Sequence, residues 1–89
     1  MKAIVTVVGT DKVGIIAAVS GCLSDLQVNI LDIRQTTMQE YFTMMMLVDT
    51  AACTVDLATL QSTLCELGKS IGEDIRLQHE DIFHSMHRV

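Results

Sequence analysis

A short polar turn between two apolar segments carries the residue types best suited to binding a small charged molecule. Residues 9–14 read Gly-Thr-Asp-Lys-Val-Gly, and they join an apolar run to a segment with helical spacing that begins at Ile15. The first N–H groups of a helix have no partner within it, and with the helix dipole they attract anions such as carboxylates. Asp11 can also cap this helix. The turn therefore predicts either a carboxylate-binding site or a plain strand-to-helix connection without a ligand.

The apolar patterns around this turn predict the elements that hold it. Helical spacing predicts two helices, and alternating or continuous apolar runs predict four strands. In chain order these are a strand at 3–8, a helix at 15–26, strands at 30–38 and 41–48, a helix at 57–71 and a strand at 73–80. Thr54 is expected to cap the second helix and Gly72 to end it. The order predicts an α+β protein with a ferredoxin-like βαββαβ fold: a four-stranded antiparallel sheet, two helices on one face and a short C-terminal helix in residues 81–89.

The two strands expected at the centre of this sheet, 3–8 and 41–48, are apolar on both faces. Because two helices cover only one face, one of two alternating sets must face away from them. The sets are Met44, Met46 and Val48, or Tyr41, Thr43, Met45 and Leu47. We expect the C-terminal tail and a second subunit to cover that face in a symmetric homodimer. The alternative is that the methionines fill a loosely packed core.

Composition limits the classes of partner and compartment. The 89 residues make one domain, 1–89, and 6 basic against 11 acidic residues give a net charge of −5. This charge disfavours nucleic acid and anionic membrane surfaces as partners. No segment approaches the length of a membrane span, and no signal peptide is expected. Three cysteines, Cys22, Cys53 and Cys65, without a close pair indicate reduced, buried thiols in a cytoplasmic protein.

The turn and the start of the second predicted strand resemble the ACT domain family. Asp11 and Gly14 match the family's Asp-x-x-Gly, and Asn29-Ile30 match the Asn-Ile that opens its second strand. The resemblance runs along the whole chain, 1–89, and is to the small stand-alone ACT domain proteins of prokaryotes. It implies that an amino acid or other small ligand binds at the turn, often where two domains pair, and regulates an enzyme or a transcription factor. With no catalytic domain attached, this regulation would act in trans.

Two residues depart from the family's pattern. Val13 stands where many members have Pro, and Gln27 stands where many have Gly. The second departure predicts a non-glycine residue with left-handed geometry, at a cost on the order of 1 kcal/mol. Neither change removes a group that would contact a ligand, but the identity of the ligand stays open.

A zwitterionic ligand suits the residues that the resemblance selects. Its carboxylate would accept hydrogen bonds from the N–H groups of Gly14 and Ile15, and its ammonium would lie near Asp11 or the Asn29 side-chain oxygen. The full set of expected ligand-binding residues is Thr10, Asp11, Lys12, Gly14, Ile15, Asn29 and Ile30. No catalytic residue and no cofactor are predicted. A structural dimerisation module with an empty turn is the main alternative.

Other functions fit the sequence less well. An acylphosphatase-like hydrolase of this fold would need an Arg in the first loop, which offers only Lys12. A P-loop would need Lys and Ser or Thr in place of Ile15-Ile16, and an RNA-binding sheet would need more aromatic residues than Tyr41 and Phe42. A metal site is the remaining alternative, since three histidines gather near the C-terminus: His79, His84 and His87.

Overall fold

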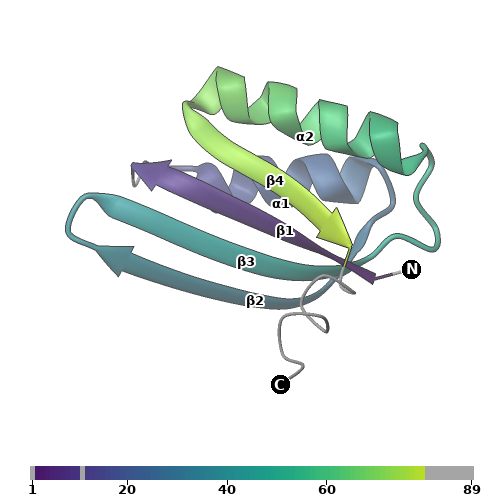
Figure 1. The fold of residues 1–89 in the computed structure, drawn as a ribbon, viewed down its shortest axis with the longest axis horizontal. Helices are drawn as coiled ribbons and strands as arrows, with labels where there is room; N and C mark the ends of the chain where they lie inside the picture. The colour runs from purple at the N-terminus through teal and green to yellow at the C-terminus, as the bar shows by residue number, and fades with distance from the viewer. Residues whose placement is uncertain (1, 11, 80–89) are drawn as a thin grey trace.

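Four strands and two helices follow one another in the predicted order βαββαβ (Figure 1). The computed structural model describes residues 2–10 and 12–79. The elements are β1 (Lys2–Thr10), α1 (Ile15–Asp25), β2 (Asn29–Met38), β3 (Tyr41–Asp49), α2 (Leu57–Ile71) and β4 (Glu73–His79). The helix predicted in residues 81–89 lies outside the described residues, as does Asp11.

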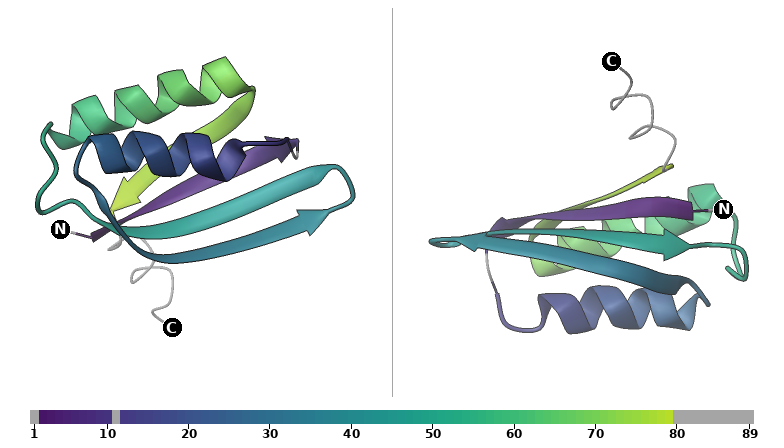
Figure 2. Two further views of the ribbon diagram at one scale, coloured as in Figure 1. Left: turned by 180° about the vertical axis from the view of Figure 1, so that it is seen from behind. Right: turned by 90° about the horizontal axis from the view of Figure 1, so that it is seen from below.

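The sheet has the predicted ferredoxin-like arrangement. Its strand order is β2-β3-β1-β4 and every neighbouring pair is antiparallel, so β3 and β1 are central and β2 and β4 form the edges. Both helices pack against the same face of the sheet (Figure 2). Within the described residues, no helix is long and apolar enough to cross a membrane.

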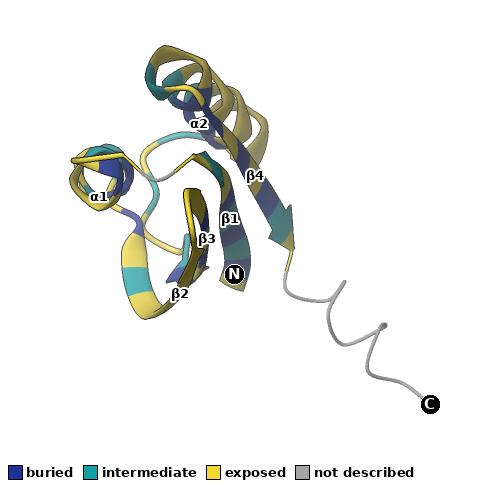
Figure 3. Cartoon of the chain, turned by 90° about the vertical axis from the view of Figure 1, so that its left-hand side faces the viewer, coloured by how far each residue is buried: buried dark blue, intermediate teal, exposed yellow. Residues whose placement is uncertain are grey.

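The hydrophobic core lies between the sheet and the helices. Alternate residues of the central strands point into it, and α1 and α2 contribute one apolar stripe each (Figure 3). The fully buried side chains include Val5, Val7, Val19, Leu23, Met44, Met46, Val48, Leu60 and Leu64. Met44, Met46 and Val48 are thus the set that faces the helices, and Met44 and Met46 fill the core.

The second alternating set on β3 therefore faces away from the helices. Tyr41 is 60 % exposed and Met45 37 % exposed, and Val8 of β1 on the same face is 46 % exposed. Asp32, Arg34 and Thr36 lie opposite Leu47, Met45 and Thr43 in the β2–β3 register. They therefore share this outer face.

The ends of α2 follow local rules, with one correction to the sequence analysis. Asp56, not Thr54, is the N-cap residue: its carboxylate accepts a hydrogen bond from the Thr59 N–H at 2.8 Å. Hydrogen bonds from the Thr59 side chain and then from its backbone N–H lower the pKa of Asp56. Thr54 instead donates its backbone N–H to the Leu26 carbonyl at 3.0 Å, which anchors the loop to α1. Gly72 ends α2 with φ 73°, as predicted.

Candidate ligand-binding site

The N-terminus of α1 presents backbone N–H groups without a side-chain cap. Gly14 is the N-cap residue with φ 89°, a left-handed conformation that favours glycine. No side chain of the described residues caps α1, and its first turn holds no acidic residue. The helix ladder starts with the Ala18 N–H donating to the Gly14 carbonyl at 2.9 Å. Among the described residues, no side chain takes the N–H groups of Ile15, Ile16 and Ala17, and such groups can bind an anion.

A hollow of about 440 Å³ lies at this helix end. It combines apolar walls with polar groups at the turn. Its lining residues are Lys12, Gly14, Ile15, Ile16, Ala17, Ser20 and Phe42. First-turn residues of α1, the Lys12 side chain and apolar side chains around one hollow match a small molecule with a carboxylate and an aliphatic part.

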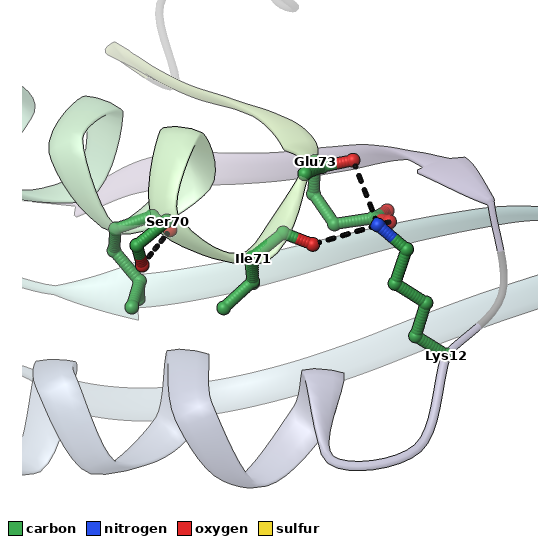
Figure 4. A network of polar contacts seen from close by, with 6 residues as sticks. Lys12, Ser70, Ile71 and Glu73 are labelled. Atoms are coloured by element: carbon green, nitrogen blue, oxygen red, sulfur yellow. Dashed lines mark hydrogen bonds and ion pairs between the residues drawn. The ribbon is translucent and has the colours of Figure 1, made fainter.

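Lys12 connects this turn to the junction between α2 and β4 (Figure 4). Its Nζ donates to the Ile71 carbonyl at 2.9 Å and to the Gly72 carbonyl at 3.4 Å. The same Nζ lies 3.9 Å from Oε2 of Glu73. Because these carbonyls end a helix, they carry the negative end of its dipole and attract a cation.

Glu73 is a buried carboxylate. Its side chain is 0 % exposed, and neither of its side-chain oxygens has a hydrogen-bond donor among the described residues. Two glycines make room for the pair. A Cβ on Gly9 would lie 2.4 Å from Oε1 of Glu73, and a Cβ on Gly72 would lie 2.4 Å from Nζ of Lys12.

The predicted site residues fall into two groups within one chain. Lys12, Gly14 and Ile15 line the hollow at the N-terminus of α1. Asn29 and Ile30 line a separate hollow of about 490 Å³ beyond the C-terminus of the same helix. The 11 residues of α1 span about 16 Å, so one small ligand cannot reach both groups in a single chain.

Thr10 and Asp11 complete the predicted set. Thr10 is exposed at the end of β1, opposite Tyr41 of β3. Asp11 lies outside the described residues, as do His84 and His87 of the alternative metal site. These parts of the sequence analysis stay predictions.

Sequence reasoning missed Glu73. The sequence analysis gave the last strand as residues 73–80 and assigned no role to Glu73. The signal was present, because Glu73 lies two residues before Ile75 and so shares its side of the strand. Glutamate is seldom fully buried, so its residue type alone does not indicate a place in the core.

The cysteines lie away from this helix end. Cys22, Cys53 and Cys65 are free thiols, and Cys65 is exposed rather than buried as predicted. Exposure follows from its position on the outer side of α2, next to Glu66. Burial and the nearby Asp25 carboxylate raise the pKa of the Cys22 thiol.

The fold and this helix end define a small ferredoxin-like protein with a candidate anion-binding turn. Comparison with known proteins bears on the family and the fold. A family model described as "ACT domain" matches residues 2–78. A UPF0237 protein of Clostridium acetobutylicum is 55 % identical over 89 residues, which is all of both chains. An ACT domain protein from Streptococcus pneumoniae is 44 % identical with a TM-score of 0.82 over 93 % of each chain.

The chain therefore belongs to the ACT domain family, whose members are regulatory modules that bind small ligands. A structure described as a putative glycine cleavage system transcriptional repressor is also similar. It is 26 % identical with a TM-score of 0.73, over 86 % of this chain and 44 % of that one.

Proposed function

We propose that this protein is a regulatory module that binds an amino acid at the N-terminus of α1 and acts in trans, as a homodimer, on an enzyme or a transcription factor. The observation that carries the proposal is the first turn of α1, which no side chain of residues 2–10 and 12–79 caps and which lies at a hollow lined by Lys12. Three N–H groups, the helix dipole and an ammonium together favour a carboxylate. The likeness to a protein described as a transcriptional repressor supports a regulatory role.

The exposed edge of β2 supports the homodimer. Nine of the ten residues of β2 are exposed, so both its backbone edge and its two faces are open. Asp32 and Arg34 flank Ile33, and two copies of β2 that pair antiparallel about Ile33 place each Asp32 opposite Arg34 of the second copy. The pairing would bury Ile33, which is 39 % exposed.

The same pairing reunites the two groups of site residues. Thr10 of β1 lies opposite Tyr41, and Tyr41 lies opposite Met38, so the turn and the end of β2 share one end of the sheet. Antiparallel pairing about Ile33 brings Asn29 of the second copy opposite Thr37, toward this turn. A ligand could then contact both copies and shift their packing.

Charge reversal tests the homodimer. Asp32→Arg should place two positive charges opposite each other and give a monomer by light scattering, and Asp32→Arg with Arg34→Asp should restore the dimer. The other edge offers a matched control, because Asp74, Ile75 and Arg76 repeat the same order on β4. Ile75 is already covered, at 6 % exposed, so Asp74→Arg should leave the dimer intact. A wild-type monomer, or loss of the dimer only in Asp74→Arg, contradicts this interface.

Amino-acid binding is tested with uniformly ¹⁵N-labelled protein. Each of the twenty common L-amino acids is titrated, and the amide signals of Ile15, Ile16 and Ala17 are followed. We expect at least one amino acid to shift these signals and to raise the melting temperature. At a concentration of one hundred times its Kd, that amino acid should raise the free energy of unfolding by about 2.7 kcal/mol. A dimer whose turn amides respond to none of them supports the structural dimerisation module instead.

The outer face of the sheet remains a second candidate surface for the homodimer. Tyr41, Met45 and Val8 form its exposed apolar part. Met45→Lys should leave the dimer unchanged if β2 forms the interface, and should weaken the dimer if this face does.

A further inference from the structure

Glu73 lies where an ion pair is only partly made. Its carboxylate is fully buried, and the Lys12 ammonium stands at 3.9 Å from Oε2, beyond hydrogen-bond distance. A buried carboxylate is stable when donors satisfy its oxygens, and among the described residues none does. Both carboxylate oxygens of Glu73 can therefore accept a hydrogen bond from a further donor.

The oxygens around Nζ of Lys12 form a receptor for a primary ammonium. They are the Ile71 carbonyl at 2.9 Å, the Gly72 carbonyl at 3.4 Å and the Glu73 carboxylate at 3.9 Å. An ammonium group has three donors, which such a set of acceptors can accommodate. Lys12 fills this receptor from the turn, and its side chain is 46 % exposed.

The receptor adjoins the hollow at the N-terminus of α1. Phe42, Gly9 and Glu73 form one row across β3, β1 and β4. Phe42 lines the hollow, and Glu73 extends its carboxylate over Gly9, which has no side chain to block it. The carboxylate thus lies about one strand spacing from the Phe42 wall. Lys12 contacts both sites, because its side chain lines the hollow and its Nζ binds the Ile71 carbonyl of the receptor.

We propose that Glu73 receives the ammonium of the bound amino acid, in place of Lys12, while Lys12 turns to the carboxylate of that amino acid. This inference rests on the proposed function and adds a specificity residue to it. The exchange conserves charge, because one internal ion pair is replaced by two ion pairs with the ligand. A simple carboxylate that drew Lys12 away would leave Glu73 buried without a cation, which is costly. The site should therefore prefer zwitterionic amino acids over the acids that lack the amine.

The test compares each amino acid that shifts the turn amides with the carboxylic acid of the same skeleton without the amine. In wild-type protein the amino acid should bind about tenfold more tightly or better. In Glu73→Gln this preference should fall to about one, because an amide no longer pairs with an ammonium. Glu66→Gln is the matched control, since Glu66 is 71 % exposed and pairs with Lys69 on the outer side of α2. It should keep the full preference.

A merely structural role of Glu73 would weaken both compounds equally and leave their ratio unchanged, which overturns the inference. If Glu73→Gln does not fold, ¹³C-labelled glutamate in the wild-type protein gives the second measurement. The chemical shift of the Glu73 carboxyl carbon should change when the amino acid is added and should not change when the amine-free acid is added. An equal response to both compounds overturns the inference. Turn amides that respond to no amino acid overturn the proposed function itself. If the turn amides respond to an amino acid and Glu73→Gln keeps the wild-type preference for it over the amine-free acid, only the role of Glu73 is overturned.

Discussion

Lys12 and Glu73, from distant parts of the sequence, form an ion pair with one buried member: Nζ and Oε2 are 3.9 Å apart, and the Glu73 side chain is 0 % exposed. The chain offers a matched pair on its surface. Lys69 and Glu66 lie 3.6 Å apart on α2, and both side chains are 71 % exposed. The two pairs have the same chemistry and differ in burial.

We therefore predict different coupling energies for the two pairs. A double-mutant cycle with Lys12→Met and Glu73→Gln should give a coupling of about 1–2 kcal/mol in urea unfolding, because one charge is desolvated. The cycle with Lys69→Met and Glu66→Gln should give less than about 0.5 kcal/mol. Equal couplings would mean that burial of Glu73 does not strengthen its interaction with Lys12.

Gly68 of α2 lies close against the backbone of β4. A Cβ at this position would lie 2.5 Å from the Glu73 carbonyl oxygen, and backbone cannot move aside as a flexible side chain can. Gly68→Ala should destabilise the protein by about 1–3 kcal/mol. Gly21 is the control, because it is helical with nothing within 4 Å of its Cβ position. Gly21→Ala should stabilise by up to about 1 kcal/mol, and a stabilising Gly68→Ala in thermal or urea unfolding would refute this packing.

Gln27 has φ 63°, the left-handed geometry predicted from the glycine that many ACT domains have at this place. Gln27→Gly should raise the free energy of unfolding by about 0.5–1 kcal/mol, because glycine adopts this conformation without a steric penalty. Gln61 is the control: it is exposed within α2, where Gln61→Gly should cost about 1 kcal/mol. Destabilisation by both substitutions would show that Gln27 is not strained.

Cys22 should be alkylated more slowly than the exposed Cys65. Burial, and then the Asp25 carboxylate, raise its pKa above the ordinary 9.0, so less reactive thiolate is present at any pH below that value. Iodoacetamide labelling followed by peptide mass spectrometry should give a midpoint for Cys22 above pH 9.0. Asp25→Asn should lower that midpoint and leave Cys53 unchanged. A Cys22 midpoint at or below 9.0 would contradict the stated burial.

Periodicity was enough to establish the fold of the described residues. The ferredoxin-like order placed residues 3–8 and 41–48 at the centre of the sheet, and their continuous apolar runs agree with that place. In the structure only one face of these strands lies in the core, while Tyr41, Met45 and Val8 on the other face are exposed. The turn at residues 9–14 was predicted from local backbone rules, and the left-handed geometry of Gln27 was predicted from the glycine that many ACT domains have at this place. Thr54 was mistaken for the cap of α2 because Asp56 satisfies the same rule two residues later.

Only the tertiary structure decided what surrounds the turn. Strand register placed Glu73 over Gly9, and helix packing brought the end of α2 to Lys12. It also set Asn29 at the far end of α1 from Gly14. Such contacts depend on how elements distant in sequence pack together. The spacing of residues within one element carries no information about this packing. The sequence alone therefore determined the elements and their order, while packing determined which charged groups meet.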